Sequence, residues 1–506
     1  MTEGTQLLRT QPAGHCRSAA ALAPGDLVPA AAALLADGMR LALVAAHDDG
    51  MALRAVYLFT SGPPDRRIEL HVPIDRARPQ VPSLAELSFP ASRFEREMQD
   101  LFGIEPLGHP QPRRLILHHH WPRGWHPMRR GAGQPPPMVA DAGSYPFVPV
   151  EGAGVYELPV GPVHAGLIEP GHFRFWVVGE TILRMKARLW FVHKGIERLF
   201  EGRDVASGLE LAERISGDTA VGHATAYCQA VEDAYGKEVG PDARILRSAL
   251  LELERLYNHV ADIGALCNDV GFGLAHAWAL ELRERLLGLN RSVTGHRLLR
   301  GGVVPGGARV VRLPTGQDLH EVAERFEQLV DLALSNVHVV ERFTGTATLH
   351  PTQATELGVV GVAGRASGVP FDTRVAHPTG GPIPGASVLQ SRGDVLARFN
   401  VRVDEVRASL DLLAGTVGSE ASLEDVRPIE KASPPRPSGV GIAEAWRGAA
   451  VHRVELGNDG LLTRVKVVDP SFLNWPALPV SLADTIVPDF PLANKSFNLS
   501  YAGNDL

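Results

Sequence analysis

Residues 243–268 carry one apolar stripe at helical spacing, and no other feature constrains the fold as strongly. The stripe recurs every three or four residues and consists of Leu246, Leu250, Leu253, Tyr257, Val260, Ile263 and Cys267. This spacing is typical of a helix that buries one continuous face. The sequence predicts further helices over residues 209–235, 275–289, 316–342 and 395–414. Several long helices in succession predict a helix bundle as the core of this region.

The N-terminal part has a different pattern. Two apolar segments, residues 39–47 and 51–59, flank the turn signal Asp48-Asp49-Gly50 and predict a β-hairpin. Because helical stretches accompany these strands, we predict a small α+β domain over residues 1–120. The fold class of the whole chain is therefore α+β.

A stretch rich in Pro and Gly separates the two regions. Residues 121–154 disfavour the interior of a helix or strand, so we interpret them as a linker between domains. The second domain, residues 155–506, begins with two predicted strands, at residues 157–163 and 172–178. A shorter loop at residues 432–439 precedes a C-terminal end that is predicted to be rich in strands.

The composition is that of an ordinary soluble chain of 506 residues, and its net charge of −7 gives no reason to expect nucleic-acid binding. None of the three cysteines, Cys16, Cys228 and Cys267, lies in a CxxC pair, so neither a disulfide framework nor a thiolate metal site is expected. There is no signal pattern and no apolar run of the ~18 residues that span a bilayer. Any link to a membrane is therefore expected to run through partner subunits. A free soluble enzyme is the alternative.

Residues 95–116 read EREMQDLFGIEPLGHPQPRRLI. This segment resembles, without a gap, the signature of the 30 kDa subunit of respiratory complex I. The matching charged and polar positions are Glu95, Arg96, Glu97, Asp100, His109 and Arg113, and the apolar pairs are Leu101-Phe102 and Leu115-Ile116. Charges of both signs around apolar pairs favour a subunit contact over catalysis. The resemblance implies a domain that docks beside a large subunit and is not itself a redox site.

Four histidines close to this signature invite a metal interpretation: His118, His119, His120 and His126. Consecutive residues of a strand point to opposite faces, so the first three would not converge on one ion. A structural or surface role is predicted.

From Gly161 onward the chain resembles the large subunit shared by complex I (the 49 kDa type) and the group 4, energy-converting nickel–iron hydrogenases. The order of the two parts also resembles that of formate hydrogenlyase large subunits. The resemblance depends on the order and spacing of several segments: residues 161–175, 193–204, 214–232, 250–272, 364–374, 393–406, 444–448 and 489–503.

In the hydrogenases of this family, two CxxC pairs hold the nickel–iron centre. The corresponding positions here are Ser216, Thr219, Ser500 and Gly503. Hydroxyl groups are hard ligands that stay protonated at neutral pH, and glycine has no side-chain ligand, whereas nickel and iron in such centres need soft thiolates. No metal is therefore predicted in this chain, and hydrogenase activity of its own is not expected.

Complex I lacks these cysteines and uses the vacated cavity for quinone. The resemblance places its two headgroup-binding positions at Ile168 and Gly217, and neither side chain can donate a hydrogen bond. Quinone reduction stays open as a hypothesis because Asp218, Thr219 and His223 lie close by in the sequence.

Four residues are the catalytic candidates: Glu169, Arg447, Asp218 and His223. Glu169 matches a carboxylate that relays protons in the family, and an enclosed carboxylate has a raised pKa; the alternative is a solvated loop acid. Arg447 matches an arginine beside the metal. Without a metal, a buried arginine needs a carboxylate, which Glu169 or Asp218 could supply. Trp446, at a position that is proline in the family, is expected to crowd the cavity.

Glu197 matches a magnesium ligand of the hydrogenases. The C-terminal histidine of that magnesium site is missing, since the sequence ends at Leu506. We therefore expect Glu197 to pair with a nearby Arg or Lys rather than with Mg²⁺.

The resemblance implies a large subunit in a membrane-associated oxidoreductase complex. Its expected partners are a small subunit that carries a 4Fe–4S cluster and antiporter-like, complex I-like membrane subunits, on the cytoplasmic side of the plasma membrane. Electrons from NADH or ferredoxin would pass to an acceptor such as quinone, coupled to ion or proton translocation. No dinucleotide-binding fingerprint occurs, so an NAD(H) site would lie on another subunit. The alternative is a structural or coupling subunit without redox chemistry.

Overall fold

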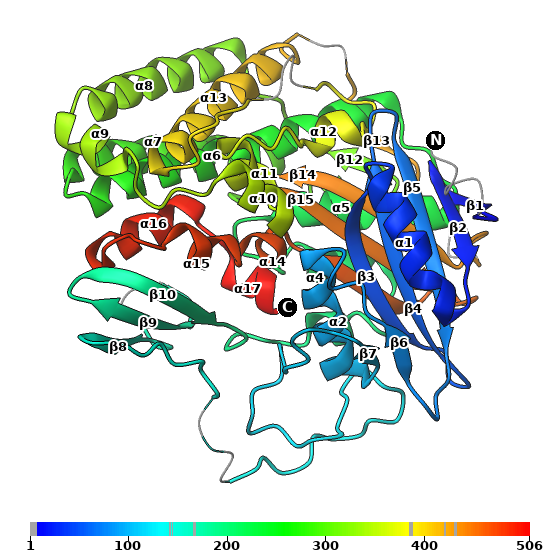
Figure 1. Ribbon diagram of the computed structural model, residues 1–506. Helices are drawn as coiled ribbons and strands as arrows, with labels where there is room; N and C mark the ends of the chain where they lie inside the picture. The colour runs from blue at the N-terminus through cyan, green and yellow to red at the C-terminus, as the bar shows by residue number, and fades with distance from the viewer. Residues whose placement is uncertain are drawn as a thin grey trace.

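The computed structural model describes residues 8–140, 143, 145–164, 168–383, 388–418, 421–429 and 433–506. Figure 1 shows a β-sheet built from the N-terminal residues on one side of the molecule and a bundle of long helices on the other, with the C-terminal helices between the bundle and the small sheet β8–β10. The α+β class predicted from the sequence is confirmed by this architecture and by the family matches given below.

The N-terminal sheet has the strand order β1-β2-β5-β4-β3. The predicted hairpin is confirmed, since β3 (Arg40–Asp48) pairs antiparallel with β4 (Leu53–Ser61). The pairing of β2 with β5 is parallel, whereas the other neighbours are antiparallel. The remaining elements are β1 (Gln11–Gly14), β2 (Arg17–Ala21), α1 (Leu27–Ala36), β5 (Arg66–Ile74), β6 (Gln80–Pro82), α2 (Phe89–Phe102) and β7 (Glu105–Leu107).

The described residues between β7 and β8 contain no helix or strand, as the linker interpretation requires. Residues 141, 142 and 144 of the predicted linker, and residue 432 of the predicted shorter loop, lie outside the described residues. One hydrophobic core contains side chains from both ends of the chain. Within it the rings of Phe94 and Phe472 stack with their centroids 4.9 Å apart. The domain boundary at residues 121–154 therefore stays a prediction.

The two strands predicted after the linker are present as β8 (Val155–Val160) and β9 (His172–Val178). The prediction missed β10 (Thr181–Arg188), which pairs antiparallel with β9. These three strands form the sheet that projects below the C-terminal helices in Figure 1.

The helix bundle is confirmed. Its core is formed by α5 (Ala220–Tyr235), α6 (Pro241–Asp269), α7 (Gly273–Thr294), α8 (Gly316–Leu334) and α13 (Val395–Ala414). Two predicted helices are wrong in their continuity. Residues 209–235 are divided between α4 (Val205–Ala212) and α5. Residues 316–342 are divided between α8 and α9 (Val337–Phe343), because the Asn336 side chain accepts hydrogen bonds from the first amides of α9.

A sheet of β14 (Ser438–Ala445), β15 (Gly448–Leu456) and β16 (Leu462–Val468) covers α5. The close approach requires glycine on β14: a Cβ at Gly439 or Gly441 would lie 1.9 Å from a backbone oxygen of α5. The prediction of a strand-rich C-terminal end holds as far as Val468. The chain then forms α14 (Pro470–Asn474), α15 (Ala477–Ser481), α16 (Phe490–Phe497) and α17 (Tyr501–Asp505).

Shorter elements complete the large region: α3 (Ile196–Leu199), β11 (Val303–Val304), β12 (Gly307–Arg309), α10 (Pro351–Leu357), α11 (Gly361–Ala366), α12 (Thr373–Ala376) and β13 (Glu424–Val426). Two 3₁₀ turns, η2 (Pro24–Asp26) and η3 (Val487–Asp489), precede α1 and α16. In the parts of the chain that the structure covers, no helix combines the length and the apolar character needed to cross a bilayer.

Candidate functional site

The four positions that the resemblance assigns to metal-binding cysteines belong to two segments that the fold brings together. Ser216 and Thr219 lie in the turn between α4 and α5, whereas Ser500 and Gly503 lie at the start of α17. The hydroxyl oxygens of Ser216 and Ser500 are 2.8 Å apart, and both side chains are buried. We call the surroundings of these four residues the vacated site.

The vacated site does not fit a nickel–iron centre. Its hydroxyl groups are already engaged: Ser216 Oγ and Thr219 Oγ1 each donate to Asp218 Oδ1 at 3.0 Å. Ser500 Oγ accepts from the Gly503 amide at 2.9 Å and caps α17. A Cβ at Gly503 would lie 2.4 Å from the Asp469 carboxylate. The space that a thiolate at this position would need is therefore filled by an acidic group of the chain itself.

Asp218 and Arg447 form a bidentate ion pair at this site. The Arg447 Nη1 and Nη2 atoms donate to Asp218 Oδ1 at 2.6 Å and Oδ2 at 2.7 Å. Burial raises the pKa of Asp218, but the Arg447 charge and the hydrogen bonds from Arg447, Ser216 and Thr219 outweigh burial and lower this pKa to about 2. The Asp218 side chain is 39% exposed, so this anion stands at the open edge of the site. Of the two predicted carboxylates, Asp218 is the one that pairs with Arg447.

Trp446 fills the space beside this pair. Its indole nitrogen donates to the Asp218 backbone oxygen at 2.9 Å and to Thr219 Oγ1 at 3.1 Å. The Arg447 guanidinium lies 3.8 Å from the centre of the Trp446 ring, which adds a cation–π contact. Together these contacts hold the guanidinium in one position.

His223 belongs to a chain of buried polar groups behind the site. Its Nε2 lies 2.9 Å from Asp469 Oδ2, and its Nδ1 lies 3.0 Å from His452 Nε2. Burial, followed by the neighbouring His223, lowers the pKa of His452 well below its ordinary value. Sequence reasoning missed Asp469 and His452. The Asp469-Pro470 pair is a helix-start signal that marks the first of them; no sequence signal marks the second.

The other three positions inferred from the resemblance, Glu169, Ile168 and Gly217, lie at the rim. Glu169 is half-buried, and its Oε2 accepts a hydrogen bond from the Ala502 amide at 3.0 Å, next to Gly503. Ile168 is 46% exposed. At Gly217 an added Cβ would meet no atom within 4 Å, so this position faces open space. Neither Ile168 nor Gly217, the two positions that the resemblance assigns to quinone binding, is enclosed by this chain alone.

A carboxyl group that sequence reasoning missed lies beneath the site. Glu254 of α6 is buried and accepts hydrogen bonds from the Val221 and Gly222 amides, at 2.7 and 2.9 Å. These amides belong to the first turn of α5, and a carboxyl group is favourable at the N-terminus of a helix. Burial raises the pKa of Glu254 to about 8 despite these bonds. Burial thus opposes the ionisation of this carboxyl group.

Glu197 pairs with basic groups, as predicted. It lies 3.0 Å from Lys466 Nζ and 2.7 Å from Arg464 Nη2. Lys466 Nζ is also 2.5 Å from Glu97 Oε1 of α2. An ammonium group thus stands where the two buried carboxylates converge, so the arrangement does not fit Mg²⁺. Burial opposes ionisation of both acids, but the charges of Arg464 and Lys466 lower the pKa of Glu197 to about 2, whereas burial prevails at Glu97 and raises its pKa.

The other residues of the 30 kDa-like signature contact their own chain. Asp100 Oδ2 accepts hydrogen bonds from the amides of residues 115–117. Arg96 donates to the Arg113 backbone oxygen at 2.7 Å, and His109 Nε2 lies 3.1 Å from the Ser92 backbone oxygen. These bonds fasten the segment that follows α2. A contact with another subunit through the signature stays a prediction.

Glu95 makes the stability of the chain depend on pH. It is fully buried, its oxygens accept from Ser83 Oγ and the Leu84 amide, and burial raises its pKa from 4.5 to about 7. A pKa raised in the folded state contributes stability that is present below pH 4.5 and is lost as pH rises through 7. In a Glu95→Gln variant the amide oxygen and NH₂ group can replace both hydrogen bonds without ionising.

We therefore expect Glu95→Gln to gain about 2–3 kcal/mol relative to the wild-type chain between pH 4.5 and pH 8. Urea unfolding of both chains across this range measures the difference. Groups that titrate equally in both chains cancel. A difference that does not vary with pH would contradict the assignment.

The histidines after the signature do not form a group. His118, His119 and His120 lie in a turn rather than the strand on which the prediction depended, so that premise is wrong. His118 Nε2 lies 3.0 Å from the Trp190 backbone oxygen, and His126 Nδ1 lies 3.0 Å from the Asp100 backbone oxygen. None of the four belongs to a potential metal-binding group in the described part of the chain.

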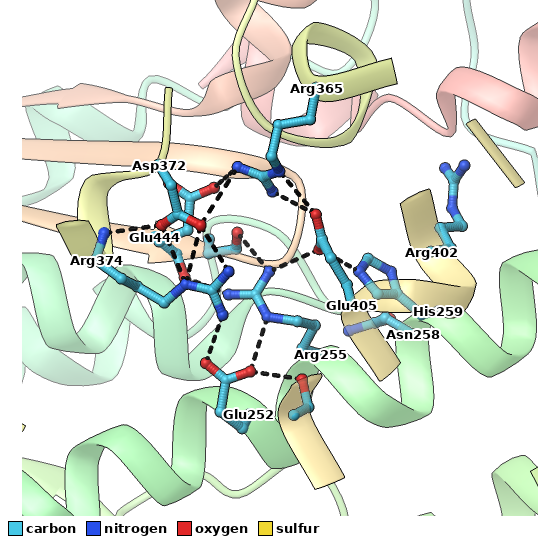
Figure 2. A network of polar contacts seen from close by, with 12 residues as sticks. Glu252, Arg255, Asn258, His259, Arg365, Asp372, Arg374, Arg402, Glu405 and Glu444 are labelled. Carbon is cyan, nitrogen blue, oxygen red and sulfur yellow. Dashed lines mark hydrogen bonds and ion pairs between the residues drawn. The ribbon is translucent and has the colours of Figure 1, made fainter. Parts of the chain in front are cut away.

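A pocket of about 280 Å³ lies elsewhere, between α5, α6, β14 and the turn after β1. A buried ionic network, drawn in Figure 2, includes the pocket-lining residues Glu252, Arg374 and Glu444. Arg365 joins Glu405 to Glu444, at 2.7 Å from each, and His259 Nε2 lies 2.8 Å from Glu405. The His259 ring contacts Trp446 edge-on, at 6.0 Å between centroids. The network thus extends from the lining residue Glu444 to the neighbours of Arg447.

Three protein families match parts of the chain. Residues 21–135 match the respiratory-chain NADH dehydrogenase 30 Kd subunit, residues 194–267 the nickel-dependent hydrogenases, and residues 269–425 the respiratory-chain NADH dehydrogenase 49 Kd subunit. The match to the nickel-dependent hydrogenases includes Ser216 and Thr219. The three matched ranges follow one another in the order expected when a 30 kDa-like part is fused to a large subunit.

Curated relatives cover most of the chain. It is 33% identical to formate hydrogenlyase subunit 5 of Escherichia coli (strain K12), over 87% of this chain and 79% of that protein. It is 32% identical to hydrogenase-4 component G of the same organism, over 85% and 77%. Among solved structures, a chain of a membrane-bound sulfane sulfur reductase, an archaeal respiratory membrane complex, matches with a TM-score of 0.62 at 24% identity, over 71% of this chain and 100% of that chain. This last likeness shows the fold alone.

Proposed function

Since the chain belongs to the group 4, formate hydrogenlyase-type family of hydrogenase large subunits, in which 30 kDa- and 49 kDa-like parts of complex I are fused, we propose that it acts as the large subunit of a membrane-associated oxidoreductase complex without nickel–iron chemistry. Electrons would arrive from a 4Fe–4S cluster in a small partner subunit. The acceptor would bind at the vacated site, and quinone is the acceptor that we favour. The complex would sit on the cytoplasmic face of the membrane with antiporter-like subunits.

One observation carries this proposal: the vacated site is polar, ordered and free of thiolates. The Ser216–Ser500 hydroxyl pair lies between the Asp218–Arg447 ion pair and the buried His223–Asp469 pair. Such a site can bind a polar headgroup by hydrogen bonds but cannot hold a soft metal centre.

The charge and the position of each residue indicate its role at the vacated site. Asp218 stays anionic at neutral pH and holds Arg447, so its role is to position the guanidinium rather than to donate protons. Arg447 would bind the carbonyl oxygen of an acceptor and stabilise the negative charge that develops there on reduction. Glu169, at the rim, is the group through which protons would reach the site from solvent.

The ionic network of Figure 2 favours a second candidate, a coupling subunit without redox chemistry. Arg255 and Arg374 are each held by two carboxylates, and Arg365 is held by three. Guanidinium groups keep their protons, so this network does not conduct protons. It instead makes a rigid element between the vacated site and the 280 Å³ pocket, which suits the transmission of movement.

Turnover of the isolated complex decides between the two candidates. We expect quinone-analogue reduction to fall about 100-fold in Asp218→Asn and Glu169→Gln variants, because positioning and proton transfer at the site are lost. An exposed carboxylate on α8, changed by Glu321→Gln, provides the matched control. Unchanged turnover in both site variants would favour the coupling role. One nickel ion per chain in the purified complex would overturn the proposal.

A further inference from the structure

A group of metal-ligating atoms lies outside the vacated site, at one end of the N-terminal sheet. His15, Cys16 and Asp65 each offer a ligand atom, and these atoms lie within 4.8 Å of one another. Across the residues that the structure describes, no other group of His, Cys, Asp and Glu meets this spacing. Sequence reasoning dismissed Cys16 because it has no CxxC partner. The ligands that accompany it come from the preceding residue, His15, and from another turn, which carries Asp65.

The topology of the sheet builds this group. Parallel pairing of Arg17 on β2 with Arg67 on β5 places the turns that precede both strands at the same end of the sheet. The first turn carries His15 and Cys16, and the second carries Asp65. Cys16 has a φ of +50°, a left-handed conformation that non-glycine residues rarely adopt. Such a conformation often marks a functional position.

The distance between the two strongest ligands suits a tetrahedral ion. Cys16 Sγ and His15 Nε2 are 3.6 Å apart. Zinc bonds of about 2.3 Å to sulfur and about 2.05 Å to nitrogen, at the tetrahedral angle, place the two ligand atoms roughly 3.6 Å apart. The pair is thus already at the separation that the metal would impose.

Asp65 is held in place by groups that leave it able to bind. His377 Nδ1 lies 2.8 Å from Asp65 Oδ1, and the Arg67 guanidinium donates to both carboxylate oxygens, at 3.1 and 2.8 Å. Oδ2 accepts only the second of the Arg67 bonds among the described residues, so one of its lone pairs is free. Carboxylates that bind a metal are usually held by hydrogen bonds of this kind.

We propose that His15, Cys16 and Asp65 bind a Zn²⁺ ion, with water as the fourth ligand. A mixed set of one thiolate, one imidazole and one carboxylate favours zinc over calcium or magnesium, which prefer oxygen ligands alone. Arg67 pairs with both oxygens of Asp65, so the Cys16 thiolate would supply the negative charge that attracts the cation. Because His377 belongs to the end of α12, the ion would also stabilise the contact between the N-terminal sheet and the large region.

Binding would release a proton, because zinc binds cysteine as the thiolate and displaces the hydrogen of the thiol.

The reactivity of Cys16 tests the proposal in the full chain. Cys228 and Cys267 are buried, so a thiol reagent such as DTNB should modify Cys16 alone in the folded protein. We expect one equivalent of Zn²⁺ to slow this modification at least about tenfold and to raise the thermal midpoint, since zinc binds the folded state. Co²⁺ should give a thiolate-to-metal absorption band.

His15→Ala should abolish the protection, and because His15 is exposed this change leaves the fold intact. Asp65→Asn should weaken the protection. Cys16→Ser removes the thiolate and should therefore abolish the cobalt absorption band. His338→Ala, at an exposed histidine of α9, is the matched control and should behave as wild type. Protection that needs a large excess of zinc, or that persists in His15→Ala, would overturn the proposal.

Discussion

A chain with Lys466→Met should lose about 3–5 kcal/mol of its unfolding free energy, because the change leaves buried carboxylates without their cation. Lys466 Nζ lies 2.5 Å from Glu97 and 3.0 Å from Glu197, and all three side chains are buried. Arg464 still serves Glu197 after the change. The cost therefore falls on Glu97, which connects α2 to the sheet β14–β16.

The loss should grow with pH. Without Lys466 the folded-state pKa of Glu97, which burial already raises, rises further. A raised pKa contributes stability that is lost as pH rises, so the deficit should be smaller at pH 5 than at pH 8. The midpoint of urea unfolding at both pH values measures it.

Two further variants separate the charge from the packing. Glu97→Gln combined with Lys466→Met removes the unpaired anion and should recover more than half of the loss. Lys194→Met changes an exposed lysine and should stay within about 0.5 kcal/mol of wild type. A Lys466→Met chain as stable as wild type at pH 8 would show that the ammonium group does not hold this junction.

Local periodicity predicted the elements that the chain builds from neighbouring residues. The helix α13 has the predicted bounds, and α6 extends the prediction by a few residues. The break between α4 and α5 could not be predicted in this way. Ile215 is buried and continues the apolar pattern, but the turn that contains it is fixed by contacts of Ser216 and Asp218 with residues more than two hundred positions away.

The site shows the same division. The family motifs located Ser216, Ser500 and Arg447. Because a buried arginine needs a carboxylate, the sequence also offered two candidate partners for Arg447. The structure shows that Asp218 is the partner. His452, Lys466 and Glu254 stayed hidden. Their partners are 229, 369 and 33 positions away in the sequence, and no local pattern marks such pairs.

Returning all four cysteines to the vacated site should not restore nickel binding. Gly503→Cys places its Cβ 2.4 Å from the Asp469 carboxylate. Asp469 cannot retreat cheaply, since its oxygens are bonded to His223 Nε2 at 2.9 Å and the Ser471 amide at 2.7 Å. Gly503→Ala alone should therefore cost about 1–3 kcal/mol through overpacking. Gly217→Ala is the matched control, because a Cβ there meets no atom within 4 Å.

Nickel per chain, measured in the four-cysteine variant from a host that makes nickel–iron hydrogenases, should stay far below one. Adding Asp469→Ser to this variant removes the clash, and we expect this change to raise the nickel content per chain. Stoichiometric nickel in the four-cysteine variant with Asp469 intact would mean that the carboxylate yields to a thiolate. The barrier to metal would then be the missing sulfur alone, and the polar site around Arg447 would be a consequence of that loss rather than a second function built in its place.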